Sequence, residues 1–140
     1  MIALWTQEKP AYHGRFVSFG GVNAMPRPVQ KPHPEVVFGG HTKEAYSRSA
    51  RLAHGWYGFA LDLDGTAKCI EGLRDALKEA ERPFADIEIS VTPRGRVDRD
   101  TMTRFADLGV SRLILLHRAR DEAGILSFID QTAKDLIAPA

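Results

Sequence analysis

The pattern of hydrophobic and polar positions changes after residue 34. From there, short runs of β-branched and aromatic residues alternate with longer segments whose apolar residues recur at helical spacing. A short apolar run that ends in glycine or a turn residue is typical of a buried strand, and a period of 3.6 is typical of a helix packed on one face. The pattern predicts strands over residues 36–40, 56–60, 87–91 and 112–117. It predicts helices over residues 42–53, from about residue 65 to Pro83, around residues 102–106, and over the segment that carries Ile125, Phe128, Ile129, Thr132 and Leu136 on its apolar face.

Three residues within these helices have expected structural roles. Asp64 is expected to cap the second helix, because a carboxylate before the first turn accepts hydrogen bonds from free backbone amides. Gly109 is expected to end the third helix, since glycine readily takes the left-handed conformation found there. Cys69 lies beside the apolar face of the second helix and is expected to be a packing thiol.

The strand–helix unit therefore occurs four times. Strands joined by helices run parallel, and a parallel sheet needs cover on both faces. An open doubly wound sheet and a piece of a (β/α)8 barrel both fit this pattern. Four strands cannot close on themselves, because a barrel of this kind needs eight.

Residues 1–34 differ from the rest of the chain. They combine scattered aromatic residues and glycines with a segment, residues 26–34, that holds four of the eight prolines. Proline disfavours helix both at its own position and at the preceding one, so this segment is expected to be extended. A linker into the next strand and a ligand for a proline-recognising domain are both compatible with it. We expect a single domain over residues 1–140, with residues 1–34 as a lead-in and residues 35–140 as four βα units.

Composition and charge narrow the classes of function. The net charge of +1 argues against non-specific nucleic-acid binding and gives no electrostatic reason to bind an anionic membrane. No apolar run approaches the roughly 18 residues of a membrane span, and the N-terminus has no secretory signal pattern, so a cytoplasmic protein with a small-molecule substrate is expected. The single cysteine and five scattered histidines give no metal-site spacing, and no metal is expected.

The turn after the first βα strand carries the clearest chemistry. Gly39 and Gly40 end the strand, and a helix is expected to begin two residues later. Glycines allow a ligand to approach the backbone closely, and the free amides of the helix start, together with the Thr42 hydroxyl, form a site suited to a phosphate. On composition alone, a glycine pair after a strand is more often a simple turn. The spacing is neither the dinucleotide fingerprint, which needs a third glycine, nor a P-loop.

The wider segment resembles the luciferase-like monooxygenase superfamily, whose bacterial luciferase relatives bind a flavin or the deazaflavin coenzyme F-420. The similarity rests on a proline-rich lead, a strand ending in two glycines, a Ser/Thr-bearing helix start, an arginine-bearing helix and a Gly-Trp turn. In this sequence these elements are residues 26–34, Gly39-Gly40, Thr42, Arg48 to Arg51 and His54-Gly55-Trp56. The family usually has Asp or Gly where His54 stands, and Ser47 replaces the first of a frequent arginine pair.

The resemblance implies an α/β fold in which the parallel βα units form the C-terminal half of a TIM (β/α)8 barrel. It implies coenzyme F-420 or FMN as cofactor, with the phosphate-bearing tail held by Gly39, Gly40, His41 and Thr42. In the family, most residues on the substrate and ring side come from the N-terminal half. The resemblance therefore implies a truncated oxidoreductase that binds cofactor weakly and turns over little or not at all.

Other residues are weaker candidates. His117 ends the fourth predicted strand, where catalytic groups gather in barrels, and is a candidate acid, base or ring ligand; a solvated strand end is the alternative. Arg94 and Arg96 follow the third strand and are suited to a second anionic group of the cofactor, or to a solvated turn. Asp62 and Asp64 suggest paired acids after the second strand, although capping by one of them explains part of that pattern.

Two functions of other classes stay open. Exposed strand edges favour pairing, so a non-catalytic half-barrel is expected to assemble as a homodimer or with a partner chain that supplies the missing half. An open α/β domain that binds a phosphorylated metabolite is the third reading.

Overall fold

The computed structural model describes residues 1–137 as two compact units, which meet in the sequence between Glu35 and Val36. The first unit holds helix α1 (Ile2–Thr6) and an antiparallel pair of short strands, β1 (Tyr12–His13) and β2 (Ser18–Phe19). The Arg27 guanidinium donates a hydrogen bond to the Glu8 carbonyl at 2.8 Å. Residues 26–34 form neither helix nor strand. The sequence pattern missed α1 and the hairpin, because each is too short to show a period.

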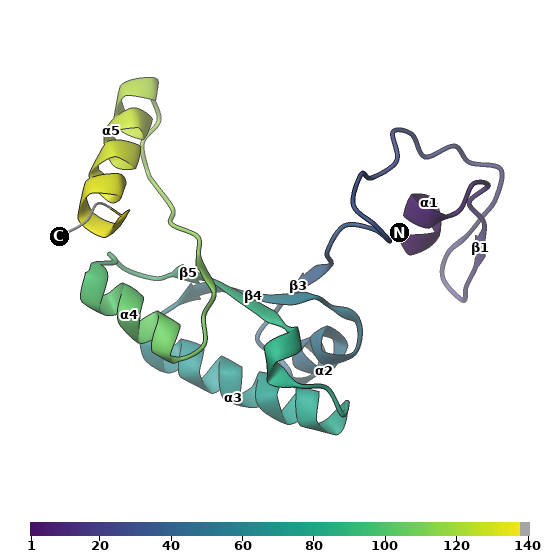
Figure 1. The fold of residues 1–140 in the computed structure, drawn as a ribbon, viewed down its shortest axis with the longest axis horizontal. Helices are drawn as coiled ribbons and strands as arrows, with labels where there is room; N and C mark the ends of the chain where they lie inside the picture. Colours follow the sequence, from purple (N-terminus) through teal and green to yellow (C-terminus); the bar gives the residue numbers. More distant parts are fainter. Residues whose placement is uncertain (138–140) are drawn as a thin grey trace. The chain divides into compact units, whose positions relative to one another are not determined.

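The second unit is a four-stranded parallel sheet with helices between the strands (Figure 1). The strand order follows the sequence, and all three neighbouring pairs are parallel. The strands are β3 (Val37–Gly39), β4 (Gly55–Leu61), β5 (Glu88–Pro93) and β6 (Arg112–Leu113). The helices are α2 (Lys43–Leu52), α3 (Leu63–Glu79), α4 (Arg99–Asp107) and α5 (Glu122–Thr132), with a short 3-10 helix η1 (Phe84–Asp86) and a π turn η2 (Ala133–Ile137). The predicted α/β class with parallel βα units is confirmed.

The core lies between the sheet and the helices α2, α3 and α4, which all lie on one side of it (Figure 1). Trp56, Ile89 and Val91 point from the strands into this layer, and Leu73 and Phe105 enter it from α3 and α4. Each of these side chains is almost fully buried and contributes about 1.5–3 kcal/mol relative to exposure. Cys69 is buried in the same cluster, as predicted.

Carboxylates and a hydroxyl fix where the helices begin. Helix α3 begins at Leu63, and the Asp62 carboxylate accepts a hydrogen bond from the Gly65 amide at 2.8 Å. The prediction that Asp64 caps this helix was therefore wrong, because the helix starts earlier and Asp64 falls in its first turn. Gly109, with a φ of +98°, follows the end of α4 as predicted.

Within residues 1–137, no helix packs along the opposite face of the sheet. Side chains alternate between the faces of a strand, so Tyr57 and Phe59 point away from the face that buries Trp56. Phe59 is 54% exposed, and Val37, on the same face, is 49% exposed. A parallel sheet is normally covered on both faces, so this uncovered face, here called the open face, departs from the usual arrangement.

The last two elements differ from their predictions. Strand pairing of β6 covers Arg112–Leu113 alone, and beyond it the Ile114 amide still donates to the Val91 carbonyl at 2.9 Å. Helix α5 forms as predicted, but none of its residues is buried, and Ile129 is 54% exposed. Apolar spacing alone located the helix; it could not show that this helix does not enter the core.

Candidate functional site

The turn after β3 is shaped by the glycine pair. Gly40 has a φ of +122°, and a Cβ added there would lie 2.8 Å from the Cβ of Ala45 in α2. The Gly40 carbonyl accepts a hydrogen bond from the Trp56 indole at 3.0 Å. The positive φ and the close approach of Ala45 both require glycine at position 40, because a side chain there would strain the backbone and collide with α2. The turn thereby brings the chain tightly onto the N-terminus of α2.

Three groups meet at that N-terminus. The Thr42 hydroxyl caps α2 by accepting a hydrogen bond from the Ala45 amide at 3.3 Å. The Glu44 carboxylate accepts hydrogen bonds from its own backbone amide and from the Thr42 hydroxyl, and both lower the pKa of Glu44. A helix N-terminus favours negative charge, and here the exposed Glu44 supplies it. A carboxylate of the chain itself therefore lies at the N-terminus of α2, where the sequence predicts a phosphate.

His41 lies on the β4 side of this turn. Its Nε2 accepts from the Phe59 amide at 3.4 Å, and its ring centroid lies 6.1 Å from that of Trp56. His54, at the point where the family usually has another residue, sits at the opposite end of the sheet. Its Nδ1 accepts from the Val36 amide at 3.0 Å, so it orders the start of the strands.

Tyr57 connects the glycine turn with the neighbouring strand. A Cβ added at Gly39 would lie 3.3 Å from the Tyr57 carbonyl and 3.7 Å from its ring, so Tyr57 packs beside the turn. Its hydroxyl shares a hydrogen bond of 2.7 Å with the Thr92 hydroxyl on β5. Sequence patterns predicted no site role for either residue. Their pairing depends on the register of β4 and β5, which one sequence does not reveal.

A cavity of about 740 Å³ lies beyond Thr92, at the carboxyl ends of β5 and β6. Helix α5 and the turn that follows it close one side. Its polar lining includes Thr92, Arg94, Arg96, His117, Arg118 and Asp135. Ligand sites of α/β barrels lie at this end of the strands.

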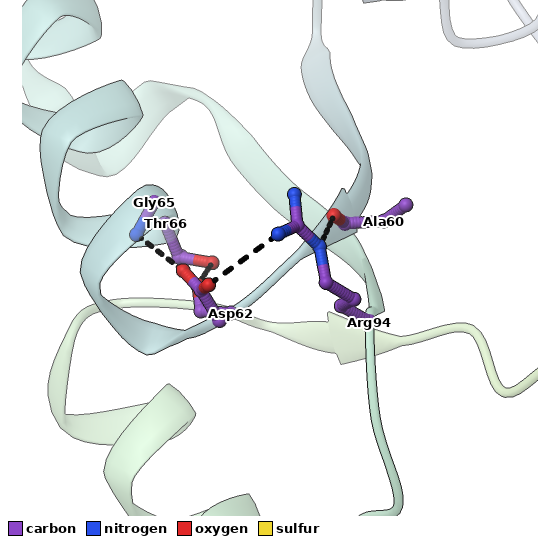
Figure 2. A network of polar contacts seen from close by, with 5 residues as sticks. All are labelled: Ala60, Asp62, Gly65, Thr66 and Arg94. Atoms are coloured by element: carbon purple, nitrogen blue, oxygen red, sulfur yellow. Dashed lines mark hydrogen bonds and ion pairs between the residues drawn. The ribbon is translucent and has the colours of Figure 1, made fainter.

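Arg94 connects the rim of this cavity to the end of β4 and to the residue that follows it (Figure 2). Its Nε donates to the Ala60 carbonyl at 3.1 Å, and its Nη1 lies 3.8 Å from the Asp62 carboxylate. Asp62 also caps α3 through Gly65, as Figure 2 shows. Asp62 therefore has two structural contacts, and these account for its position without acid–base chemistry.

The structure brings some predicted residues together and leaves others apart. Arg94 and Arg96 follow β5 and His117 follows β6, and all three line one cavity. The Gly39–Thr42 turn lies at the same sheet edge but does not line it, and β4 stands between the turn and β5. Arg118 was missed, because nothing in its sequence context distinguishes it from a solvated arginine.

Residues 1–137 offer neither a candidate metal site nor a candidate membrane-spanning helix. No group of three or more His, Cys, Asp or Glu side chains there could hold a metal ion. No helix of that range is long and apolar enough to cross a membrane.

Comparison with known sequences identifies relatives. An uncharacterized protein of Mycobacterium tuberculosis is 30% identical over 145 residues, which cover 97% of this chain and 47% of the relative. The FMNH2-dependent dimethylsulfone monooxygenase of Pseudomonas putida is 28% identical over 71 residues, 51% of this chain and 20% of that protein. The chain spans about half the length of the mycobacterial relative.

Solved structures show the same fold. The F420-dependent tetrahydromethanopterin reductase of Methanopyrus kandleri superposes with a TM-score of 0.76 at 11% identity, over 97% of this chain and 59% of that one. An F420-dependent secondary alcohol dehydrogenase gives a TM-score of 0.61 at 12% identity, over 80% of this chain and 51% of that one. These proteins are TIM barrels, so the four parallel βα units correspond to part of such a barrel. The sequence pattern described as luciferase-like monooxygenase matches residues 1–106, and the chain belongs to that family.

Proposed function

We propose that this chain is the cofactor-tail part of a luciferase-like oxidoreductase, which binds the phosphate-bearing tail of FMN or coenzyme F-420 at residues 39–42. The observation that carries the proposal is the glycine turn that leads directly from a parallel strand into the capped N-terminus of α2. The names of the related proteins, one FMNH2-dependent and others F420-dependent, support this choice of cofactors.

The residues present fit a phosphate. Gly39 and Gly40 leave the backbone accessible, Thr42 offers a hydroxyl, and the dipole of α2 favours negative charge. Glu44 now occupies the hydrogen bonds that a phosphate would take. Because Glu44 is exposed, its side chain can turn into solvent when a dianion arrives. The bound cofactor would supply hydride or oxygen chemistry at its ring, and this chain would hold and orient the tail.

The competition between Glu44 and the ligand gives a specific test. Glu44→Gln removes the competing charge, so FMN or coenzyme F-420 is expected to bind several-fold more tightly. Thr42→Val removes the hydroxyl and is expected to weaken binding, while Thr42→Ser preserves it. Binding is measured by fluorescence titration of the full chain with each cofactor. Substitution of Gly40 would not serve, because its Cβ would collide with Ala45 and disturb the turn itself.

The matched control is Glu71→Gln, an equal charge change at an exposed position in the middle of α3. If Glu44→Gln and Glu71→Gln change the affinity alike, the effect is one of net charge and the site is not at the α2 N-terminus. If no variant binds either cofactor, the proposal is wrong for this chain.

A second candidate function is assembly, and the open face favours it. Exposed apolar side chains on that face, Phe59 and Val37 among them, are suited to contact with a further set of strands. A half-barrel that pairs with a second copy or with a partner chain would cover them. The two proposals are compatible, because the glycine turn lies at the edge of the sheet and not on its open face.

A further inference from the structure

We propose that the cavity at the carboxyl ends of β5 and β6 is a second binding site, for a small anionic compound with an apolar body. This site goes beyond the cofactor-tail site. It lies two strand positions away from the glycine turn, about 10 Å at the usual strand spacing, and shares no lining residue with it.

Charge determines the class of ligand. Three arginines line the cavity, at positions 94, 96 and 118, against one carboxylate, Asp135. Arg96 lies 3.6 Å from that carboxylate, and the Asp135 carbonyl accepts from Arg99 at 2.8 Å, so Asp135 is held by cations and leaves a net positive lining. Guanidinium groups match phosphate, sulfonate and carboxylate oxygens in pairs.

Arg94 and Arg96 differ in the number of contacts that they make within the chain. Arg94 is fixed by the Ala60 carbonyl and by Asp62, so it is a rigid part of the rim (Figure 2). Arg96 is 88% exposed, and its one ion pair within residues 1–137 is with Asp135, at 3.6 Å. An ion pair exposed to solvent in this way contributes little stability, so an incoming anion can draw Arg96 away from Asp135. We assign Arg96, with Arg118, as the main anion contacts.

An apolar wall faces these cations. Leu115 and Leu116 come from the segment after β6, and Phe128 and Leu136 come from α5 and its C-terminal turn. The Phe128 ring lies 5.6 Å from that of His117 and forms a flat aromatic surface at the cavity. The volume of about 740 Å³ is in the range of small-molecule sites, which usually combine apolar walls with a few polar anchors. The ligand class is therefore an aromatic or aliphatic body with one anionic group.

Phenyl phosphate is a suitable probe for the test. Titration into the isotope-labelled full chain, followed by amide NMR, is expected to shift signals of Gly95, Val97, Leu116 and Arg118. Benzyl alcohol, the uncharged counterpart, and inorganic phosphate, which lacks the ring, are each expected to bind at least fivefold more weakly. If inorganic phosphate binds as tightly as phenyl phosphate, the apolar wall does not contribute to binding. If benzyl alcohol binds as tightly, the arginines do not bind the anion, and either result contradicts the proposal.

Variants locate the contacts. The double change Arg96→Gln and Arg118→Gln is expected to weaken phenyl phosphate binding at least tenfold. Both residues are exposed, so folding should be unaffected. The matched control is Arg104→Gln, an exposed arginine of α4 that does not line the cavity. An unchanged affinity in the double variant, or shifts confined to residues 39–45, would refute the proposal.

The same titration separates this site from the cofactor-tail site. Thr42→Val is expected to leave phenyl phosphate binding unchanged, so failure of one site is distinguishable from failure of the other. Adding coenzyme F-420 or FMN then identifies the natural source of the anion. Competition with phenyl phosphate means that a second anionic group of the cofactor enters the cavity, and simultaneous binding means that a separate substrate does.

Discussion

The residues that cap the N-terminus of α2 lie where the phosphate is proposed to bind. Thr42 and Glu44 satisfy the free amides of the helix, which would otherwise need water or a ligand. The same residues occupy the place where a phosphate would bind. A site that is complete without its ligand is stable when empty, and it binds more weakly because the carboxylate must first leave.

Glu44 should therefore stabilise the fold in a pH-dependent way. Its folded-state pKa lies below the ordinary value of 4.5, so its contribution is present above that value and is lost as the pH falls through the folded pKa. Glu44→Gln is expected to lower the free energy of unfolding at neutral pH, and the difference from the unaltered chain should shrink as the pH falls below 4.5. Urea denaturation over a series of pH values from neutral to acidic measures this. A difference that persists at low pH would mean that the glutamine disturbs packing and not a charge interaction.

At the scale of elements, the order of strands and helices could be predicted because each has a distinct period. The residues at which helices begin and end depend on single hydrogen bonds, which the spacing of apolar residues does not reveal. Helix α3 begins at Leu63 because the carboxylate of Asp62, and not that of Asp64, accepts a hydrogen bond from the Gly65 amide. The fourth strand is shorter than predicted, since β6 pairs on one side only, with β5. Residues that follow one strand, such as Gly39 to Thr42, could be recognised together from sequence. The meeting of Arg94, Arg96 and His117 could not, because it depends on where α5 lies.

The two aspartates at the start of α3 can be compared directly. Asp62→Ala removes the cap and the Arg94 contact, and should cost about 0.5–2 kcal/mol of unfolding free energy. Asp64→Ala removes only a first-turn charge, which is typically worth about 0.3–1 kcal/mol. Thermal and urea unfolding of the two variants give the comparison. A larger loss in Asp64→Ala would contradict the cap described here.

At the scale of the whole molecule, the open face is unusual for an isolated parallel sheet of four strands. It is expected for one part of a barrel, the fold to which the family resemblance points. Strands β3 and β6 are the two edges, and all four strands point the same way. In a closed eight-stranded barrel, β6 of one copy would pair with β3 of the other, and the converse pair would form by two-fold symmetry about the barrel axis. Parallel direction is preserved at both junctions, so the geometry permits closure by two identical chains.

Phe59 tests whether the open face takes part in such an assembly. It is 54% exposed on that face, and covering it in both copies would contribute about 1.5–3 kcal/mol each. Phe59→Ser is therefore expected to raise the dissociation constant of a dimer at least about tenfold. Leu52→Ser is the matched control, because Leu52 is 62% exposed at the end of α2, on the helix side of the sheet. Light scattering over a range of concentrations measures the state of each chain. A single mass corresponding to the monomer at every concentration, or equal weakening by both variants, would show that this face does not join two copies.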